Sequence, residues 1–293
     1  MTSVHLPVLP VQVLELLAPQ RGQTFVDATL GGGGHACLIA EKLGASGHLI
    51  ALDRDPAALG RARIRLQQVS DTPRLTLVHS NFDRLRLVLD ELKIDRVDGV
   101  LADLGFSSDQ IETAERGLSF QREGPLDMRL DPTEEQTAGD IIASWSERDL
   151  ADLFYHLGEE RHSRRVAKKI VKLRDETPIT TTIQLAEIVR SCLPRSHTGL
   201  DPATRVFQAL RIGVNDELGS LKRLLEALPR CLNKGGKAAI ISFHSLEDRM
   251  VKWAFRESET WEILTKKPVE ATEEEEAANP RSRSAKLRVA RLV

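Results

Sequence analysis

Cysteine is scarce in this sequence, and aromatic residues make up only 4% of it. The three cysteines, Cys37, Cys192 and Cys231, are far apart and odd in number, which argues against a disulfide framework and gives no zinc-ligand spacing. We expect all three to be small packing residues in a reducing compartment. We also expect no metal site, because no cluster of ligand residues occurs.

A long apolar run is missing too. The first twenty residues lack a basic segment followed by an apolar stretch, so the sequence indicates neither a signal peptide nor a membrane span. A length of 293 residues is enough for one large domain with an insertion, or for two domains. We therefore expect a cytoplasmic protein without a membrane partner. The sequence leaves monomer and homodimer open.

Charge of one sign is not in excess, since the net charge is only −2, but the charges are unevenly distributed. Residues 161–174 contain seven Lys or Arg residues and no acid, whereas residues 112–152 contain eleven acids and four arginines. On a helix, residues 161–174 would bury a stripe that includes Val166 and Ile170 and expose the cations. For an isolated run, a solvated helix face is the better explanation. Beside a nucleoside-cofactor site, phosphate binding becomes an equal alternative.

Strands and helices alternate regularly over the first hundred residues. The apolar pattern predicts strands at 24–28, 48–52, 74–79 and 97–103, and helices at 10–17, 35–43, 56–69 and 83–92. This alternation is typical of a parallel, doubly wound sheet.

After Leu104 the pattern changes to a loop and then to helices. These helices are predicted at 138–144, 147–155, 160–173, 182–191 and 202–213. The alternation resumes with helices at 215–232 and 246–256 and strands at 237–243, 261–265 and 286–292, and the acidic run 273–276 is predicted to be an exposed loop. We infer a discontinuous domain of residues 1–133 and 213–293, interrupted by a helical insertion of residues 134–212.

The most informative motif is a run of four glycines, 31–34, between the first predicted strand and the following helix. Glycines let backbone N–H groups approach a ligand at a helix N-terminus, and Asp53, which ends the next strand, can bind the two hydroxyls of a ribose. The sequence therefore predicts a nucleoside-cofactor site.

The glycine spacing alone does not identify the cofactor. Gly31, Gly33 and Ala36 also fit the G-x-G-x-x-A dinucleotide motif, so an NAD-dependent oxidoreductase stays open on this ground. Asp27, directly before the loop, is unfavourable beside a pyrophosphate. It suits a cofactor that carries positive charge, such as S-adenosylmethionine.

The residues that end each predicted strand are further candidates, because ligands bind at that edge of such a sheet. They are Asp27, Asp53, Asn81 with Phe82, and Asp103. Phe82 either packs against an adenine face or is a core residue. Enzymes that methylate an exocyclic amine often need an acceptor at this edge to orient the N–H groups of the amine, and Asp103 is the best candidate for that catalytic role. Cofactor binding by Asp103 is at least as well supported, and Ser107 and Ser108 are candidate substrate contacts.

A long non-periodic segment, residues 117–129, is too apolar to be disordered and is expected to line the active site. Asp127 and Arg129 are its candidate substrate contacts. His244 stands where a strand ends and a helix begins, with Ser245 as the predicted cap and Asp248 three residues later. A structural role is the better explanation for His244, and a substrate contact is the alternative.

Several segments together carry a family resemblance. They are DATLGGGGHA, ALDRDP, HSNF, LADLGFSS, GPLDMRLDP, PATRVFQALRI, GGKAAIISFHSLEDR and NPRSRSAKLR. With them, nearly the whole chain resembles the ribosomal RNA small subunit methyltransferase H family, formerly called MraW. GPLDMR and SFHSLEDR are far more diagnostic than the glycines. The chain departs from the family pattern at Pro10, usually leucine, and in the short stretch 261–279.

The resemblance implies a class I S-adenosylmethionine-dependent methyltransferase: a Rossmann-like, doubly wound α/β sheet with its last strand antiparallel, and an inserted all-helical domain that recognises RNA. It implies methyl transfer to N4 of a cytidine in the decoding region of 16S rRNA, within the small ribosomal subunit. The implied cofactor contacts are Gly33, Gly34, His35, Asp53, Phe82, Asp103 and Gln110. The exposed cations of the insertion, Arg164, Arg165, Lys168 and Lys169, become candidate RNA contacts. A non-enzymatic alternative is an RNA-binding assembly factor with a vestigial cofactor site.

Overall fold

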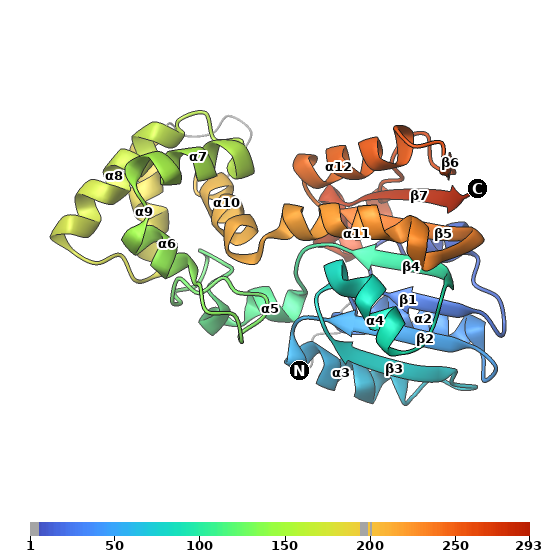
Figure 1. Ribbon diagram of the computed structural model, residues 1–293. Helices are drawn as coiled ribbons and strands as arrows, with labels where there is room; N and C mark the ends of the chain where they lie inside the picture. Colours follow the sequence, from blue (N-terminus) through green and yellow to red (C-terminus); the bar gives the residue numbers. More distant parts are fainter. Residues whose placement is uncertain (1–5, 194–198, 200) are drawn as a thin grey trace. The chain divides into compact units, whose positions relative to one another are not determined.

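The computed structural model describes residues 6–193, 199 and 201–293 (Figure 1). The contacts divide the chain into two compact units, residues 1–105 with 218–293, and residues 106–217. The second unit is longer at both ends than the predicted insertion. Residues before 134 belong to it because their backbone bonds to it: Leu126 N donates to Thr180 O at 3.2 Å, and Ala138 N donates to Asp127 O at 2.9 Å.

The first unit is built on a seven-stranded sheet with the order β3-β2-β1-β4-β5-β7-β6. Its strands are β1 (Thr24–Asp27), β2 (His48–Asp53), β3 (Arg74–His79), β4 (Val97–Asp103), β5 (Leu232–Ser242), β6 (Trp261–Ile263) and β7 (Lys286–Leu292). β1 to β5 pair in parallel, and β7 runs antiparallel to both β5 and β6. The predicted doubly wound sheet with an antiparallel last strand is confirmed.

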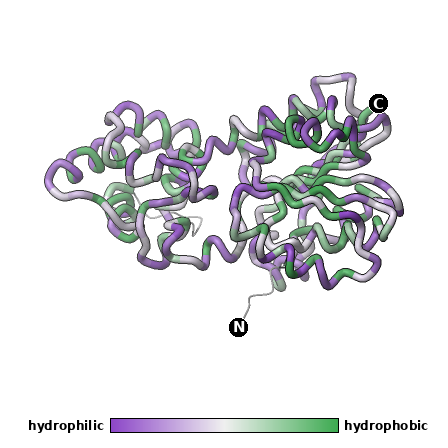
Figure 2. Tube along the Cα trace, turned by 60° about the horizontal axis from the view of Figure 1, so that its bottom comes forward, coloured by the Kyte–Doolittle hydropathy of each residue, from purple (hydrophilic) through white to green (hydrophobic). Residues whose placement is uncertain are grey.

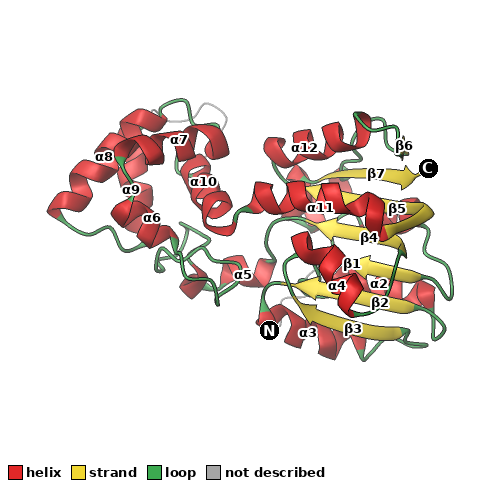
Figure 3. Ribbon diagram, viewed as in Figure 1, coloured by secondary structure: helices red, strands yellow, loops and turns green. Residues whose placement is uncertain are grey.

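Helices cover both faces of this sheet (Figure 3). They are α1 (Pro10–Leu17), α2 (Gly34–Leu43), α3 (Pro56–Leu66), α4 (Leu85–Glu91), α11 (Glu217–Cys231) and α12 (Ser245–Arg256). The short helix α13 (Glu273–Ala278) belongs to the same unit but has no buried residue. Successive strand residues point to opposite faces. Phe25 and Leu49 therefore pack with α1 and α2, whereas Val26 and Ile50 pack with α4 and α11. Figure 2 shows hydrophobic residues concentrated in the strands.

Two local details of the first unit differ from the sequence expectation. The acidic run predicted as a loop is the first turn of α13, where Thr272 accepts a hydrogen bond from Glu275 N. Negative side chains in a first turn are favoured by the helix dipole, which explains why four glutamates form a helix. Pro10 is the first residue of α1, a position where its missing N–H costs nothing, and the preceding Leu9 has a φ of 52°.

The described residues of the second unit form helices joined by irregular segments, and their only β pairing is an isolated bridge between Pro125 and Thr181. Its helices are α5 (Ser108–Glu112), α6 (Ala138–Ser144), α7 (Glu147–Gly158), α8 (Ser163–Glu176), α9 (Thr182–Cys192) and α10 (Thr204–Asn215). They enclose a core that includes Phe154, Ile170 and Leu210, all fully buried. None of the described helices of the chain is both long and apolar enough to cross a membrane.

The segment between α5 and α6 is irregular but closely packed. Gly117 has a φ of +63°, and a Cβ atom there would lie 2.0 Å from Pro125 O. Gly124 lies equally close to another part of the chain, because its Cβ would be 1.9 Å from Ala114 O. Only glycine allows these two backbone approaches.

Candidate active site

Three aspartates end neighbouring strands at one edge of the sheet. β1 ends at Asp27, β2 at Asp53 and β4 at Asp103. Asp27 is paired with Ala51 of β2 and Leu101 of β4, so Asp53 and Asp103 lie two residues further along the adjacent strands. β1 is also where the strand order reverses, the point at which open α/β sheets bind ligands.

Hydrogen bonds connect the glycine-rich loop after β1 to these strand ends. Gly31 N donates to Asp53 Oδ2 at 2.7 Å, and Asp55 N donates to Asp53 Oδ1 at 2.8 Å. Thr29 Oγ1 accepts a hydrogen bond from Asp103 N at 2.6 Å. Asp53 therefore orders the loop, a role that its position in the sequence did not reveal.

Gly33 and Gly34 form the start of α2. Gly33 has a φ of +77°, and a Cβ atom there would lie 3.1 Å from the Cβ of Ala62 in α3. At Gly34 the added Cβ would lie 3.1 Å from the ring of Pro7. The first N–H groups of a helix have no partner within the helix, so they can bind a polar ligand. Packing on α3 is an additional reason why position 33 is glycine.

The two central aspartates carry buried oxygens that lack partners. Asp27 Oδ2 and Asp103 Oδ1 have no hydrogen-bond partner among the described residues. Burial raises the pKa of Asp27 to about 7, and the negative charges of Asp103 and Asp53 add to this against a hydrogen bond from Thr29 N. Burial also raises the pKa of Asp103 to about 7, opposed by the positive charge of Arg281. A bound cationic group would favour the ionised carboxylates, so these residues fit a positively charged cofactor.

His35 and Phe82 belong to the same unit but differ in their surroundings. His35, the second residue of α2, is 6% exposed, and its Nε2 lies 4.0 Å from Asp103 Oδ2. Phe82 follows β3 and is packed in the hydrophobic core with Leu85. The structure thus brings His35 to Asp103, whereas it places Phe82 in the core.

Arg281 and Glu247 influence Asp103 and were not among the predicted site residues. The charge of Arg281 lowers the pKa of Asp103, and that of Glu247 raises it. The Arg281 guanidinium also lies 5.9 Å from the ring centre of Phe243. Both residues are more than 140 positions from Asp103 in the sequence, so no local pattern connects them to it. The signals were two family segments: NPRSRSAKLR contains Arg281, and SFHSLEDR contains Glu247.

His244 caps α12, and the predicted cap at Ser245 was wrong by one residue. His244 Nδ1 accepts a hydrogen bond from Glu247 N at 3.4 Å, and Glu247 Oε2 accepts from His244 N at 3.4 Å. His244 has an extended backbone, whereas Ser245 is already helical. Asp248, the other member of the predicted cap, is paired with Arg288 at 2.7 Å. The structural role of His244 is therefore helix capping.

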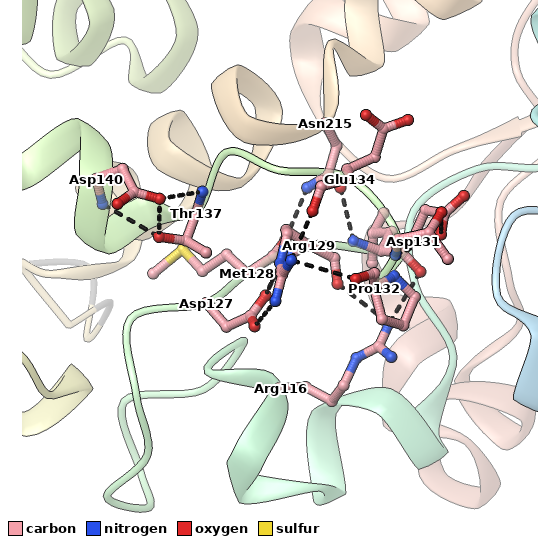
Figure 4. A network of polar contacts seen from close by, with 12 residues as sticks. Arg116, Asp127, Met128, Arg129, Asp131, Pro132, Glu134, Thr137, Asp140 and Asn215 are labelled. Atoms are coloured by element: carbon pink, nitrogen blue, oxygen red, sulfur yellow. Dashed lines mark hydrogen bonds and ion pairs between the residues drawn. The ribbon is translucent and has the colours of Figure 1, made fainter.

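Asp127 and Arg129, predicted to contact substrate, are bound to each other in the second unit (Figure 4). Asp127 Oδ1 accepts from N and Nε of Arg129 at 2.9 Å, and Oδ2 accepts from Nη2 at 2.7 Å. Arg129 Nη1 also donates to Glu134 O at 2.6 Å. Burial opposes ionisation, but the bonds from Arg129 hold the pKa of Asp127 below its ordinary value. This ion pair stabilises the loop between α5 and α6.

Ser107 and Gln110 form the capping box of α5, also in the second unit. Ser107 Oγ accepts from Gln110 N at 3.3 Å, and Gln110 Oε1 accepts from Ser107 N at 2.9 Å. Both side chains are buried. The side chain of Ser108 lies outside the described residues. A contact of Gln110 with cofactor, and of Ser107 or Ser108 with substrate, stays a prediction.

α8 and the turn before it present a run of basic residues to solvent. Val166, Ala167 and Ile170 are buried, whereas six cations are exposed: Arg161, Arg164, Arg165, Lys168, Lys169 and Lys172. Within the described part of the chain, none of the six forms an ion pair. Arg174, the seventh cation of the run, instead donates to Ile142 O at 2.6 Å.

Comparison with known proteins agrees with this geometry. The model of the MraW methylase family matches residues 2–293. The chain is 51% identical to ribosomal RNA small subunit methyltransferase H of Sorangium cellulosum, over 99% of this chain and 91% of that protein. It is 50% identical to the protein of the same name from Koribacter versatilis, over 98% and 93%.

Among solved structures, an rRNA methylase from Streptococcus thermophilus is 10% identical with a TM-score of 0.45, covering 97% of this chain and 93% of that one. The family match spans both units, with the glycine loop, the three strand-ending aspartates and α8. The chain belongs to the MraW methylase family of ribosomal RNA small subunit methyltransferases.

Proposed function

We propose that this chain transfers a methyl group from S-adenosylmethionine to the exocyclic N4 of a cytidine in the decoding region of 16S rRNA. The observation that carries the choice of cofactor is the pair of buried, partnerless carboxylate oxygens of Asp27 and Asp103 at the switch point of the sheet. They would repel a pyrophosphate and attract a cation. Family membership supports the reaction class, and the names of the curated relatives support the RNA substrate.

The residues of this site position the reactants. S-adenosylmethionine supplies a methyl group on a positively charged sulfonium. Asp53 would hold the ribose hydroxyls, Gly33 and Gly34 would allow close approach of the backbone, and Asp27 would lie near the positive charge. Asp103, held by Thr29, would accept a hydrogen bond from the cytosine amine and orient it. Positioning of the reactants and exclusion of water can together supply a large part of the rate increase over the uncatalysed reaction.

The nature of the product tests this proposal. Small-subunit particles that lack the modification are incubated with the protein and S-adenosylmethionine labelled in the methyl group, and the RNA is digested for nucleoside mass analysis. We expect label on cytosine N4. Label on a base carbon or on a ribose oxygen, with none on N4, contradicts the assignment. Naked 16S rRNA as a second substrate shows whether the assembled particle is needed.

We expect the preference for S-adenosylmethionine over S-adenosylhomocysteine to rise with pH between about 6 and 8. S-adenosylhomocysteine has the same amino group but a neutral thioether in place of the sulfonium, so the ratio of the two dissociation constants isolates the interaction of the sulfonium charge. Below a pKa of about 7, Asp27 and Asp103 are protonated and neutral, and above it they are ionised and attract the cation. The ratio should therefore rise, by at most about tenfold per pH unit for each group, and then level off.

Isothermal titration of both compounds from pH 5.5 to 8.5 measures this ratio. In the Asp27→Asn variant, which keeps the shape of the side chain but cannot ionise, the ratio should depend less on pH. A ratio that is constant with pH in the wild-type protein would place the cation away from these carboxylates.

We also propose that α8 binds RNA phosphates, because its exposed cations have no acid partners in the described structure. Changing Arg164, Arg165, Lys168 and Lys169 to Glu should weaken RNA binding more than tenfold. The slope of log affinity against log salt should fall by about 0.7 for each lost contact with single-stranded RNA. Affinity for S-adenosylhomocysteine should not change.

A variant with the same change in net charge controls for nonspecific electrostatics. Lys42, Lys93, Lys222 and Lys234 are exposed, lie in the first unit and can be changed to Glu together. We expect this control to lose much less RNA affinity than the α8 variant. Equal losses in the two variants would show that total charge, and not α8, determines binding.

A further inference from the structure

A tryptophan on α12 is unusually exposed. The side chain of Trp253 has 46% of its surface in solvent, whereas Val251 and Phe255 on the same helix are buried in the core of the first unit. The nearby Trp261 is only 8% exposed and packs against Phe255, with 5.2 Å between the ring centres. Of these two tryptophans, Trp261 is therefore a core residue and Trp253 is a surface residue.

Three cationic side chains lie near this ring on α12. Arg249, Lys252 and Arg256 lie four residues before, one before and three after Trp253, so the helix carries all three close to it. Lys252 Nζ lies 5.2 Å from the ring centre, in a cation–π contact. Arg256 Nη2 donates to Lys266 O at 3.4 Å, which brings the turn after β6 next to the helix. Lys266 and Lys267 of that turn are both exposed.

The nearby acids do not cancel this charge on the helix. Asp248 is held in an ion pair with Arg288, which is itself 7% exposed. Glu257 is the C-cap of α12, where its N–H bonds to Trp253 O, so its single negative charge offsets only part of the positive charge of this helix. Glu259 follows in the loop that leads to β6. Three cations on α12 and two in the turn that is hydrogen-bonded to it thus lie in the region of one exposed aromatic ring. We call these residues the Trp253 platform: Arg249, Lys252, Trp253, Arg256, Lys266 and Lys267.

We propose that the Trp253 platform binds a single-stranded segment of RNA, with one base stacked on the Trp253 ring and the cations on flanking phosphates. Proteins bind single strands with this combination, an aromatic side chain for the base and a positive groove for the backbone. An apolar protein partner would need neighbouring hydrophobic area, but the exposed neighbours of Trp253 here are charged. The proposal rests on the proposed function, because it assumes an RNA substrate, and it adds a contact region in the first unit to the one on α8.

The direct test measures binding of the full chain to a 12-nucleotide single-stranded RNA of mixed sequence and to the same RNA in a duplex. Trp253→Ala should lower affinity for the single strand by roughly 5- to 150-fold, the range expected for one stacked base. Trp253→Phe should restore most of it, because an aromatic face remains. The duplex should bind equally to all three proteins, since its bases are already stacked.

A double variant, Lys252→Glu with Arg256→Glu, tests the phosphate contacts without removing the ring. It should weaken binding and reduce the salt slope. Val11→Ala trims a 60% exposed apolar residue of α1, a helix without Lys or Arg; it is the matched control and should bind as wild type. Affinity for S-adenosylhomocysteine and the circular dichroism spectrum should be the same in all variants.

The outcomes separate this proposal from the proposed function. If wild type binds and methylates RNA but Trp253→Ala binds as tightly as wild type, the platform is refuted while the methyltransferase assignment stands. If wild type binds no RNA, both fail. Quenching of tryptophan fluorescence by phosphatidylserine vesicles, absent with single-stranded RNA and lost in Trp253→Phe, would reassign the surface to a membrane.

Discussion

Replacing Asp53 with alanine is expected to lower the affinity for S-adenosylhomocysteine at least about 100-fold and to abolish methyl transfer. Two effects combine here. The variant loses the carboxylate that we propose for the ribose hydroxyls, and it frees the glycine loop, because Asp53 accepts hydrogen bonds from both Gly31 N and Asp55 N. Hydrogen bonds to a charged group contribute about 1.5–3 kcal/mol each. Loss of the bonds to the two ribose hydroxyls alone is therefore enough for a 100-fold fall in affinity, which corresponds to about 2.7 kcal/mol.

Titration calorimetry with S-adenosylhomocysteine measures the affinity directly. Asp53→Asn is informative, since it keeps the size of the side chain and one acceptor oxygen, and it should fall between wild type and alanine. Asp95→Ala serves as the control, because that side chain is 95% exposed. An Asp53→Ala protein that binds normally would show that the cofactor lies elsewhere. It would also leave the vestigial-site alternative open, if modification of the RNA in cells persisted.

Replacing Gly117 with alanine should unfold or severely destabilise the helical unit. Its φ of +63° is unfavourable for alanine, and the new Cβ would lie 2.0 Å from Pro125 O, a backbone atom that cannot rotate away. Relief requires moving the chain around Pro125, whose neighbour Leu126 bonds to Thr180. We expect a loss of about 3 kcal/mol or more in the free energy of unfolding.

Gly60 offers a control of opposite sign. It lies within α3, and a Cβ atom there would meet nothing within 4 Å. Gly60→Ala should therefore stabilise the first unit by about 0.5–1 kcal/mol, because alanine favours the helix. Thermal unfolding followed by circular dichroism, with limited proteolysis to show which unit opens, measures both variants. Equal melting temperatures for wild type and Gly117→Ala would mean that the loop accommodates the new Cβ atom with no loss in the free energy of unfolding.

The sheet was predictable from the sequence because its signals are local. The strands predicted at 74–79 and 97–103 have the observed bounds, since each is an apolar run between turn residues. Asp27, Asp53 and Asp103 could be grouped for a related reason: the carboxyl ends of parallel strands meet at one edge whatever the loops do. That rule places residues at a site without knowledge of any side-chain contact.

The remaining features depend on contacts that local patterns do not encode. The second unit has wider bounds than the predicted insertion, because hydrogen bonds across the fold, such as Leu126 N to Thr180 O, connect the loop to it. The cap of α12 was wrong because a histidine ring nitrogen replaced the expected serine hydroxyl as acceptor. Arg281 reaches Asp103 only after the chain has closed the sheet, so its influence could not be read from spacing.

The pairing of β4 with β5 has a consequence for how the protein is made. These strands are hydrogen-bonded neighbours, yet the whole of residues 106–217 is synthesised between them. At roughly 5–20 residues per second, a ribosome needs on the order of ten seconds to bridge that gap. During this interval the nascent sheet of β1 to β4 has an unsatisfied edge at β4, which invites pairing with other chains. An insertion that folds quickly from local helices would shorten the distance between the two strand partners before the second one emerges.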